Sequence, residues 1–168
     1  IIIWSEKNMC NKMIKTSNGN FHKGFYESCK ENYMKQLLNI RSNNPDAESK
    51  TYYSAEFFLH GLCHIFAYDL HQKFGYDILE LENKSGGMTH WCCVSDYKRK
   101  KLYIDVRGAT TDYNEFLAEF QPNMGEHPLE KIIAEKDLID INDDFEDEEQ
   151  LKFADDIIER YYNYYSVH

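Results

Sequence analysis

The sequence predicts an α+β fold in which a cysteine-bearing helix packs on a small antiparallel sheet, flanked by N- and C-terminal helices. Apolar residues recur at helical spacing in 25–40, 63–74 and 143–165, whereas 76–106 contains short strand-like segments separated by turn residues. Consecutive strands joined by short turns pair antiparallel, and helices segregated at both ends of such a sheet are typical of this class.

The first expected element is an amphipathic helix from Phe25 to Ile40. Its apolar side recurs every three or four residues and consists of Tyr26, Cys29, Tyr33, Leu37 and Ile40. The polar run 41–44 and the following Pro45 end this pattern. Further along, Ser54 is suited to cap a short helical turn that runs through Leu59.

A core helix is expected to begin at Cys63 and to end at Gly75. Gly61 allows a sharp bend just before Cys63, and a glycine such as Gly75 often ends a helix in the left-handed conformation. The apolar stripe of this helix consists of Ile65, Phe66, Leu70 and Phe74. Cys63 therefore lies in the first turn, where the helix dipole and unpaired N–H groups favour a thiolate.

Three antiparallel strands are expected next, at 76–81, 89–94 and 102–106. A Ser-Gly-Gly loop at 85–87 separates the first two, and the basic turn 98–101 separates the second from the third.

The pairing of the second and third strands is expected to centre between Tyr97 and Lys98. In that register His90 lies directly opposite Asp105, close enough for their side chains to meet. The same register places a mostly apolar set on the other face, namely Trp91, Cys93, Leu102, Ile104 and Val106. Because a slip of one residue would exchange the two faces, the pattern favours this pairing.

Helices are expected to complete the chain. One starts at Asp112, which precedes Glu115 by three residues as in a capping box, and runs through Phe120. Pro128 suits the first turn of another, which contains Leu129, Ile132 and Ile133. The segment 143–165 combines an acidic start with an apolar stripe and predicts a C-terminal amphipathic helix.

The length of 168 residues predicts one domain, 1–168, with a core at about 25–120 and a C-terminal helical extension at about 127–165. A net charge of -10 argues against a nucleic-acid partner, because phosphate binding requires clustered Lys and Arg. An aromatic content of 15% is typical of a folded chain rather than a disordered one.

No apolar run approaches the roughly 20 residues of a membrane span, and the apolar start at 1–4 lacks a signal-peptide pattern. The five cysteines are odd in number and lack paired spacing, which favours a reducing compartment. We therefore expect no membrane partner and a cytoplasmic location, with secretion into a host or another cell left open. The low-Ala composition rich in Asn, Lys, Ile and Tyr is consistent with a microbial or phage genome.

A thiol, an imidazole and a carboxylate follow one another in the predicted helix and strands: Cys63, His90 and Asp105. This set suits acyl transfer through a thioester. The Cys63 thiolate attacks a carbonyl, His90 exchanges the proton, and Asp105 orients the imidazole. Backbone N–H groups of the first helical turn are expected to stabilise the oxyanion.

The order helix Cys63, strand His90 and strand Asp105 resembles the papain-like superfamily of cysteine hydrolases, especially its transglutaminase-like and NlpC/P60-like branches, over about 54–120. The resemblance implies a papain-like core that needs no cofactor and acts on a protein or peptide-like substrate. Peptidase, amidase, glutamine deamidase and transamidase activities stay open. Gly61-Leu62-Cys63-His64 lacks the tryptophan that follows the nucleophile in papain, which favours a compact or effector-like relative.

Accessory residues are less clearly marked. The resemblance implies an oxyanion side chain before Cys63, but no Gln or Asn lies close before it, and His60 and Tyr53 are the candidates. Cys92 shares the His90 face and is a candidate to line the site. Arg107, just beyond Asp105, either binds a substrate carboxylate or pairs with a nearby acid.

A metal site is the main competing chemistry. Nitrogen and sulfur ligands are present near the triad at His60, Cys63, His64, His90 and Cys92. However, neither a Cys-x2-Cys pair nor a His-Glu-x-x-His helix supports zinc, so no metal is expected. For His64 we expect a packing or capping role, with its ring directed away from the site by the ~100° step per helical residue.

A non-catalytic alternative is an acidic binding or inhibitor protein with the same fold. The acidic run 143–149 could dock on a basic protein partner, although a solvated helix start is the commoner explanation. We expect the tyrosines at 161, 162, 164 and 165 to pack within the protein. The second alternative is that they form an interface, such as that of a homodimer.

Overall fold

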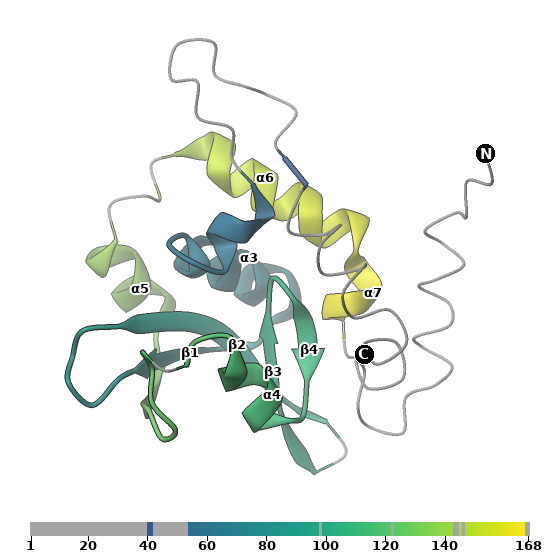
Figure 1. The fold of residues 1–168 in the computed structure, drawn as a ribbon. Coiled ribbons are helices and arrows are strands. Elements are labelled where there is room, and N and C mark those ends of the chain that lie inside the picture. Colours follow the sequence, from purple (N-terminus) through teal and green to yellow (C-terminus); the bar gives the residue numbers. More distant parts are fainter. Residues whose placement is uncertain are drawn as a thin grey trace.

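The computed structural model of the chain describes residues 40–41, 54–97, 99–121, 123–142, 145 and 147–166. It has the predicted α+β architecture, with helix α3 (Cys63–Phe74) lying between a sheet and helix α6 (Glu148–Arg160) (Figure 1). The helix expected at 25–40 lies, except for its last residue, outside the described residues, as do Tyr53, Cys10 and Cys29.

The sheet has five strands, and every neighbouring pair is antiparallel. Their order across the sheet is β4-β3-β2-β1-β5. The strands are β1 (Asp77–Glu82), β2 (Thr89–Tyr97), β3 (Lys100–Asp105), β4 (Gly108–Thr110) and β5 (Leu129–Ile133). The first four form a meander, and β5 returns along the free edge of β1 (Figure 1).

The remaining elements are helical: η1 (Ala55–Phe58), α4 (Tyr113–Ala118), α5 (Glu135–Ile141) and α7 (Tyr162–Tyr165). As predicted, Ser54 caps η1, since its hydroxyl accepts a hydrogen bond from the Glu56 N–H at 3.3 Å. Asp112 likewise caps α4 by accepting from the Glu115 N–H at 3.1 Å. None of the described helices is both long and apolar enough to span a bilayer.

Helix α3 begins and ends where the sequence predicts. Gly75 follows its last residue with a φ of 70°, the left-handed conformation that glycine adopts without strain. Ile65, Phe66 and Leu70 are buried, and the Cys93 thiol of β2 donates to the Ala67 carbonyl at 3.2 Å. The helix is therefore held against one face of the sheet by the stripe that the sequence indicates.

The C-terminal third differs from the sequence prediction. The helix expected after Pro128 is wrong, because 129–133 forms strand β5, in which Ile133 pairs with Ile78 of β1. Pro128 precedes this edge strand, a position that proline tolerates as well as a first helical turn. The extension at 127–165 is consequently not purely helical, and its first element belongs to the sheet. Neither α5 nor β4 was predicted.

The β2–β3 register also differs from the prediction. Tyr97 pairs with Lys100 and Val94 with Tyr103, so the hairpin centre lies one residue further along the chain than expected. Arg99 in the turn has a φ of 66° without being glycine. The pairing is displaced by two residues, and because side chains alternate with a period of two, each residue keeps its predicted face. His90 and Asp105 thus share a face as diagonal neighbours, not as a directly opposed pair.

Candidate functional site

The Cys63 thiol is presented by the first turn of α3. Gly61, with a φ of 136°, makes the bend before the helix, and the Leu62 N–H donates to the Phe57 carbonyl at 2.7 Å. Leu62 provides no side-chain cap, so the N–H groups of the first turn are not covered by a capping side chain. The thiol is only 4% exposed.

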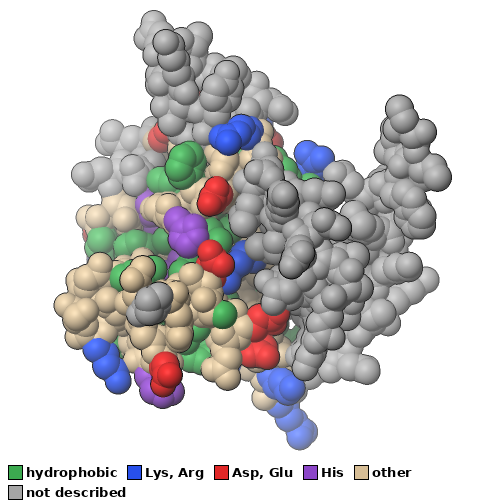
Figure 2. Space-filling view, viewed as in Figure 1, with side chains coloured by type: hydrophobic (Ala, Val, Ile, Leu, Met, Phe, Trp, Pro, Cys, Tyr) green, Lys and Arg blue, Asp and Glu red, His purple; other side chains and the backbone are tan. Residues whose placement is uncertain are grey.

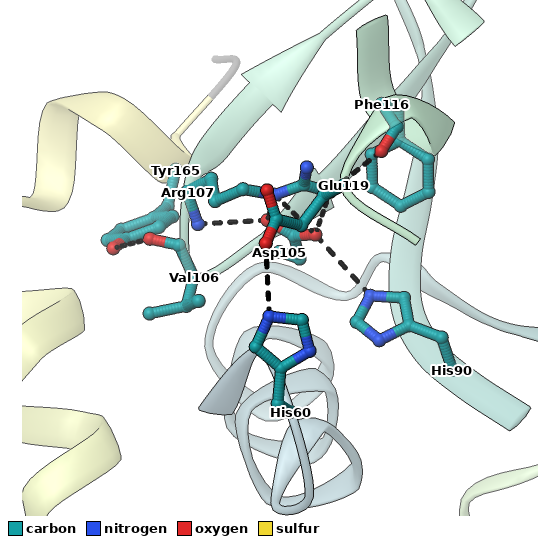
Figure 3. A network of polar contacts seen from close by, with 8 residues as sticks. All are labelled: His60, His90, Asp105, Val106, Arg107, Phe116, Glu119 and Tyr165. Atoms are coloured by element: carbon teal, nitrogen blue, oxygen red, sulfur yellow. Dashed lines mark hydrogen bonds and ion pairs between the residues drawn. The ribbon is translucent and has the colours of Figure 1, made fainter. Parts of the chain in front are cut away.

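His90, near the start of β2, and Asp105, at the end of β3, meet on the same face of the sheet. The His90 Nε2 lies 3.4 Å from the Asp105 Oδ2, and both side chains are buried (Figure 3). This separation is an ion-pair distance and is longer than that of a well-formed hydrogen bond. Since Nε2 faces the carboxylate, Nδ1 is the ring nitrogen left for the thiol of Cys63.

Arg107 holds the Asp105 carboxylate from the other side. Its Nη2 donates to Oδ2 at 2.6 Å, its Nε lies 3.1 Å from both oxygens, and its backbone N–H donates to Oδ1 at 2.8 Å (Figure 3). A further bond joins Nη2 to the Phe116 carbonyl at 3.1 Å. Of the two roles considered for Arg107, the structure therefore provides the pairing with a nearby acid.

The charges of the three residues are coupled. Burial acts to raise the pKa of Asp105, but the charge and hydrogen bonds of Arg107, together with the nearby His90, outweigh it, and the pKa lies well below its usual range. Burial likewise raises the pKa of Cys63, yet the nearby charge of His90 outweighs it, with smaller effects of neighbouring polar groups, and the pKa is lowered to about 6. Burial lowers the pKa of His90, but Cys63 and Asp105 reverse this and raise it. The combination favours a thiolate beside an imidazolium.

Aromatic rings of α4 and its C-terminal end enclose this charge pair. The Phe120 ring centroid lies 4.1 Å from that of His90, and the Arg107 guanidinium lies over Phe116 and Phe120 at 4.9 and 5.0 Å. These rings exclude water from His90 and Arg107. The sequence reasoning missed both phenylalanines, because only the packing of α4 onto this face brings them to the site.

His60, a candidate to stabilise the oxyanion, is instead paired with an acidic side chain. Its Nε2 contacts the Glu119 Oε1 at 3.1 Å, and both side chains are partly exposed. In Figure 3, His60 points toward Glu119 and His90 toward Asp105, and both rings lie below the two carboxylates in this view. Figure 2 shows that histidine and acidic side chains gather near the middle of the visible face. The other oxyanion candidate, Tyr53, lies outside the described residues.

Cys92 is on the predicted face but fully buried. Burial, with the Asp105 charge second, raises the pKa of Cys92 well above its ordinary value. It is therefore a neutral thiol beside the triad rather than a second nucleophile. Cys93 lies on the α3 face, where burial raises its pKa as well.

His64 has the packing role that the sequence predicts. Its side chain is buried, with 2% exposed. The ring packs edge-on against Trp91 at 5.8 Å and against Phe145 at 5.5 Å between centroids.

Within the described part of the chain, no group of three or more His, Cys, Asp or Glu side chains could hold a metal ion. The surface of this part of the chain is hollowed in several places, among them the following. One cavity of about 480 Å³ is lined by residues such as Asp77, Val94 and Ile132, and one of about 440 Å³ lies at the loops 83–85 and 123–127. Neither of these two cavities is lined by a residue of the triad.

No protein-family model matches the chain, and neither a curated protein nor a solved structure matches it at a significant level. What the protein does must therefore be inferred from the chemistry of its own residues.

Proposed function

We propose that the protein is a cysteine-dependent hydrolase or acyl transferase with a papain-like core, in which Cys63 is the nucleophile, His90 the acid and base, and Asp105 the residue that orients His90. One observation carries this proposal: Cys63 begins helix α3 beside a buried pair in which the His90 Nε2 lies 3.4 Å from the Asp105 Oδ2. The pKa of Cys63 agrees with it, since it is lowered to about 6 although burial alone raises it. A buried structural thiol has the opposite shift, as Cys93 illustrates.

The first half-reaction would form a thioester. The Cys63 thiolate attacks the carbonyl carbon of an amide or related acyl group, and N–H groups of the first turn of α3 stabilise the negative charge that develops on the carbonyl oxygen. As the carbonyl re-forms, the bond to the leaving group breaks. His90 gives its proton to the departing amine or alcohol.

The second half-reaction returns the enzyme to its starting state. Water, or an amine in the case of a transferase, attacks the thioester carbonyl while His90 accepts its proton. The carbon–sulfur bond then breaks and releases the Cys63 thiolate. The peptidase, amidase and glutamine deamidase alternatives differ only in the acyl compound that reaches the thiol, and none requires a cofactor.

Asp105 supports this cycle through its fixed charge. Because Arg107 holds it ionised, the carboxylate stabilises the imidazolium form of His90 and orients Nε2 toward itself. Nδ1 is then directed to the thiol in each half-reaction. A cysteine at a helix start, with the histidine and aspartate on adjacent antiparallel strands, also supports the papain-like assignment. A protein or peptide-like substrate and a cytoplasmic location are part of the same proposal.

An activated ester tests the reaction without knowledge of the natural substrate. With p-nitrophenyl acetate, the wild type is expected to release a rapid, stoichiometric burst of nitrophenolate and to carry an acetyl group on Cys63, located by peptide mass spectrometry. Cys63→Ala should abolish the burst, and His90→Asn should slow it strongly. Cys93→Ala serves as the matched control and should retain the burst. Acetylation of Cys63 no faster than in the urea-unfolded protein would contradict the proposal.

The burial of all three residues also favours a second candidate, the non-catalytic acidic binding protein. In that case the triad would be a structural remnant. The Cys63→Ala variant separates the two: a binding protein keeps its biological effect in this variant, whereas a thiol enzyme loses it while remaining folded.

A further inference from the structure

The candidate site is closed to solvent. Cys63, His90 and Asp105 are each at most 4% exposed. A carbonyl carbon has to come within about 3–3.5 Å of the sulfur before the thiolate can attack it. An acyl substrate therefore reaches the thiol only after part of the surrounding structure has moved aside.

The C-terminal end of α4 covers His90. Phe120, just beyond this helix, is buried, and its ring centroid lies 4.1 Å from that of His90. The His60 ring stands edge-on to the same phenylalanine, with 6.2 Å between centroids and an interplanar angle of 73°. Phe120 thus contacts both the buried histidine of the triad and a histidine at the surface.

A polar contact links this cover to the segment that presents Cys63. Glu119 directly precedes Phe120, and His60 lies three residues before Cys63. The His60 Nε2 lies 3.1 Å from the Glu119 Oε1, and the two side chains are 43% and 47% exposed (Figure 3). A pair that is exposed to this degree is weak, so it can break and re-form readily.

The start and the end of α4 are held differently. At the start, Tyr113 packs on Tyr103 of β3 with 4.9 Å between ring centroids. In the middle, the Phe116 carbonyl accepts a hydrogen bond from the Arg107 Nη2 at 3.1 Å. At the end, Glu119 reaches across the surface to the loop before α3. Movement is therefore expected at the last turn, while the first turn stays on the sheet.

We propose that Glu119 and Phe120 form a lid over the candidate site, and that the contact between His60 and Glu119 holds this lid closed. The inference rests on the proposed function, since only a site that takes up a substrate has to open. When the contact breaks, the last turn of α4 loosens and the Phe120 ring leaves His90. The entrance for the acyl group then lies between His60 and Glu119.

The rate of Cys63 alkylation by iodoacetamide, followed by peptide mapping, tests the lid. Because the reagent needs the open state, the rate follows the population of that state. At about pH 8.5, well above the Cys63 pKa of about 6, the rate reports access to the thiol and not its ionisation. His60→Ala and Glu119→Ala should each raise the rate about two- to fivefold, the range expected for loss of one partly exposed pair.

A charge exchange separates the contact from the individual side chains. His60→Glu places a carboxylate opposite Glu119 and should raise the rate at least as much as His60→Ala. Adding Glu119→Lys to this variant restores a pair of opposite charges and should return the rate to within about twofold of the wild type. Glu135→Ala is the matched control and should leave the rate unchanged, because Glu135 forms a similar pair with His71 at 3.8 Å near the C-terminal end of α3.

Hydrogen exchange supplies a second readout of the same motion. The Phe120 N–H donates to the Leu117 carbonyl at 2.9 Å, and the Phe116 N–H donates to the Asp112 carbonyl at 3.0 Å. In Glu119→Ala, the Phe120 amide should exchange faster by the factor seen in alkylation, whereas the Phe116 amide should not change. An unchanged Phe120 amide contradicts the lid.

The outcomes separate this inference from the proposed function. Unchanged alkylation in both alanine variants, an equal increase in Glu135→Ala, or a charge exchange that does not restore the rate overturns the lid alone. None of these results alters the burst of nitrophenolate by which the function is tested. Cys63 acetylation no faster than in the unfolded protein overturns the function, and with it the lid as the entrance for a substrate.

Discussion

Replacing Arg107 by Met tests how much the ion pair between Arg107 and Asp105, the partner of His90, contributes to stability. The Asp105 carboxylate is 3% exposed and receives four hydrogen-bond contacts from Arg107 at 2.6 to 3.1 Å. The backbone N–H contact survives the substitution, but the guanidinium contacts do not. Removing one partner of a buried ion pair leaves the other charge uncompensated and typically costs about 3–5 kcal/mol. We expect Arg107→Met to lower the free energy of unfolding at pH 7 by this amount.

Urea denaturation at equilibrium, followed by circular dichroism, measures the change. Lys101→Met is the matched control, because its ion pair with Glu130 joins side chains that are 39% and 31% exposed. Such partly exposed pairs contribute only about 0–1 kcal/mol. Arg107→Lys keeps the positive charge but lacks the planar guanidinium, so its loss of stability should lie between those of Arg107→Met and Lys101→Met. If Arg107→Met costs no more than Lys101→Met, the account of the buried carboxylate is wrong.

The pH dependence of the stability of Arg107→Met provides an independent test. In the wild type the pKa of folded Asp105 lies below the ordinary 3.8, so its contribution is complete above that value and is lost as pH falls toward the folded pKa. Without Arg107, burial raises the carboxyl pKa, and protonation then relieves the uncompensated charge. The difference in stability between wild type and Arg107→Met should therefore be largest at neutral pH and shrink below about pH 4.

Two further predictions concern stability away from the triad. Burial, with the Asp155 charge second, raises the pKa of Asp69 to about 7, and its Oδ2 is buried without a hydrogen-bond partner among the described residues. The folded state thus binds the proton of Asp69 more tightly than the unfolded state, so the free energy of unfolding should fall as pH rises from about 4 to 7. In thermal unfolding, Asp69→Asn should remove this pH dependence and stabilise the protein at pH 8 by roughly 1–2 kcal/mol. A variant no more stable than the wild type at pH 8 contradicts this prediction. The Tyr165 hydroxyl donates to the Val106 carbonyl at 2.8 Å inside the core, so Tyr165→Phe should cost about 1–2 kcal/mol in urea unfolding, and an unchanged midpoint would show that the bond contributes nothing.

Local signals in the sequence predicted the elements that depend on local chemistry. Ser54 and Asp112 cap helices with their own side chains, and Gly75 ends α3 because it tolerates a positive φ. In each case the determining contact joins residues only a few positions apart. The start of α3 at Cys63, on which the candidate site depends, belongs to this class.

The wrong predictions concern elements whose structure is determined by contacts between residues far apart in the sequence. The segment after Pro128 carries signals that suit either a helix or an edge strand, and pairing with β1 selects the strand. The turn at Arg99 contains no glycine, so its length could not be determined from residue type. The proximity of His90 and Asp105 survived this error because a displacement by two residues preserves the faces. The ring contacts of His64 and Phe120 depend on tertiary packing and could not be derived from spacing.

The central claim is that His90 holds Cys63 as a thiolate at neutral pH, and the pKa of that thiol tests it most directly. The rate of Cys63 alkylation against pH should have its midpoint near 6 in the wild type. In His90→Asn the opposing effect of burial remains, so the midpoint should rise to the ordinary value of 9.0 or above. A wild-type midpoint near 9 that does not move in His90→Asn would contradict the claim.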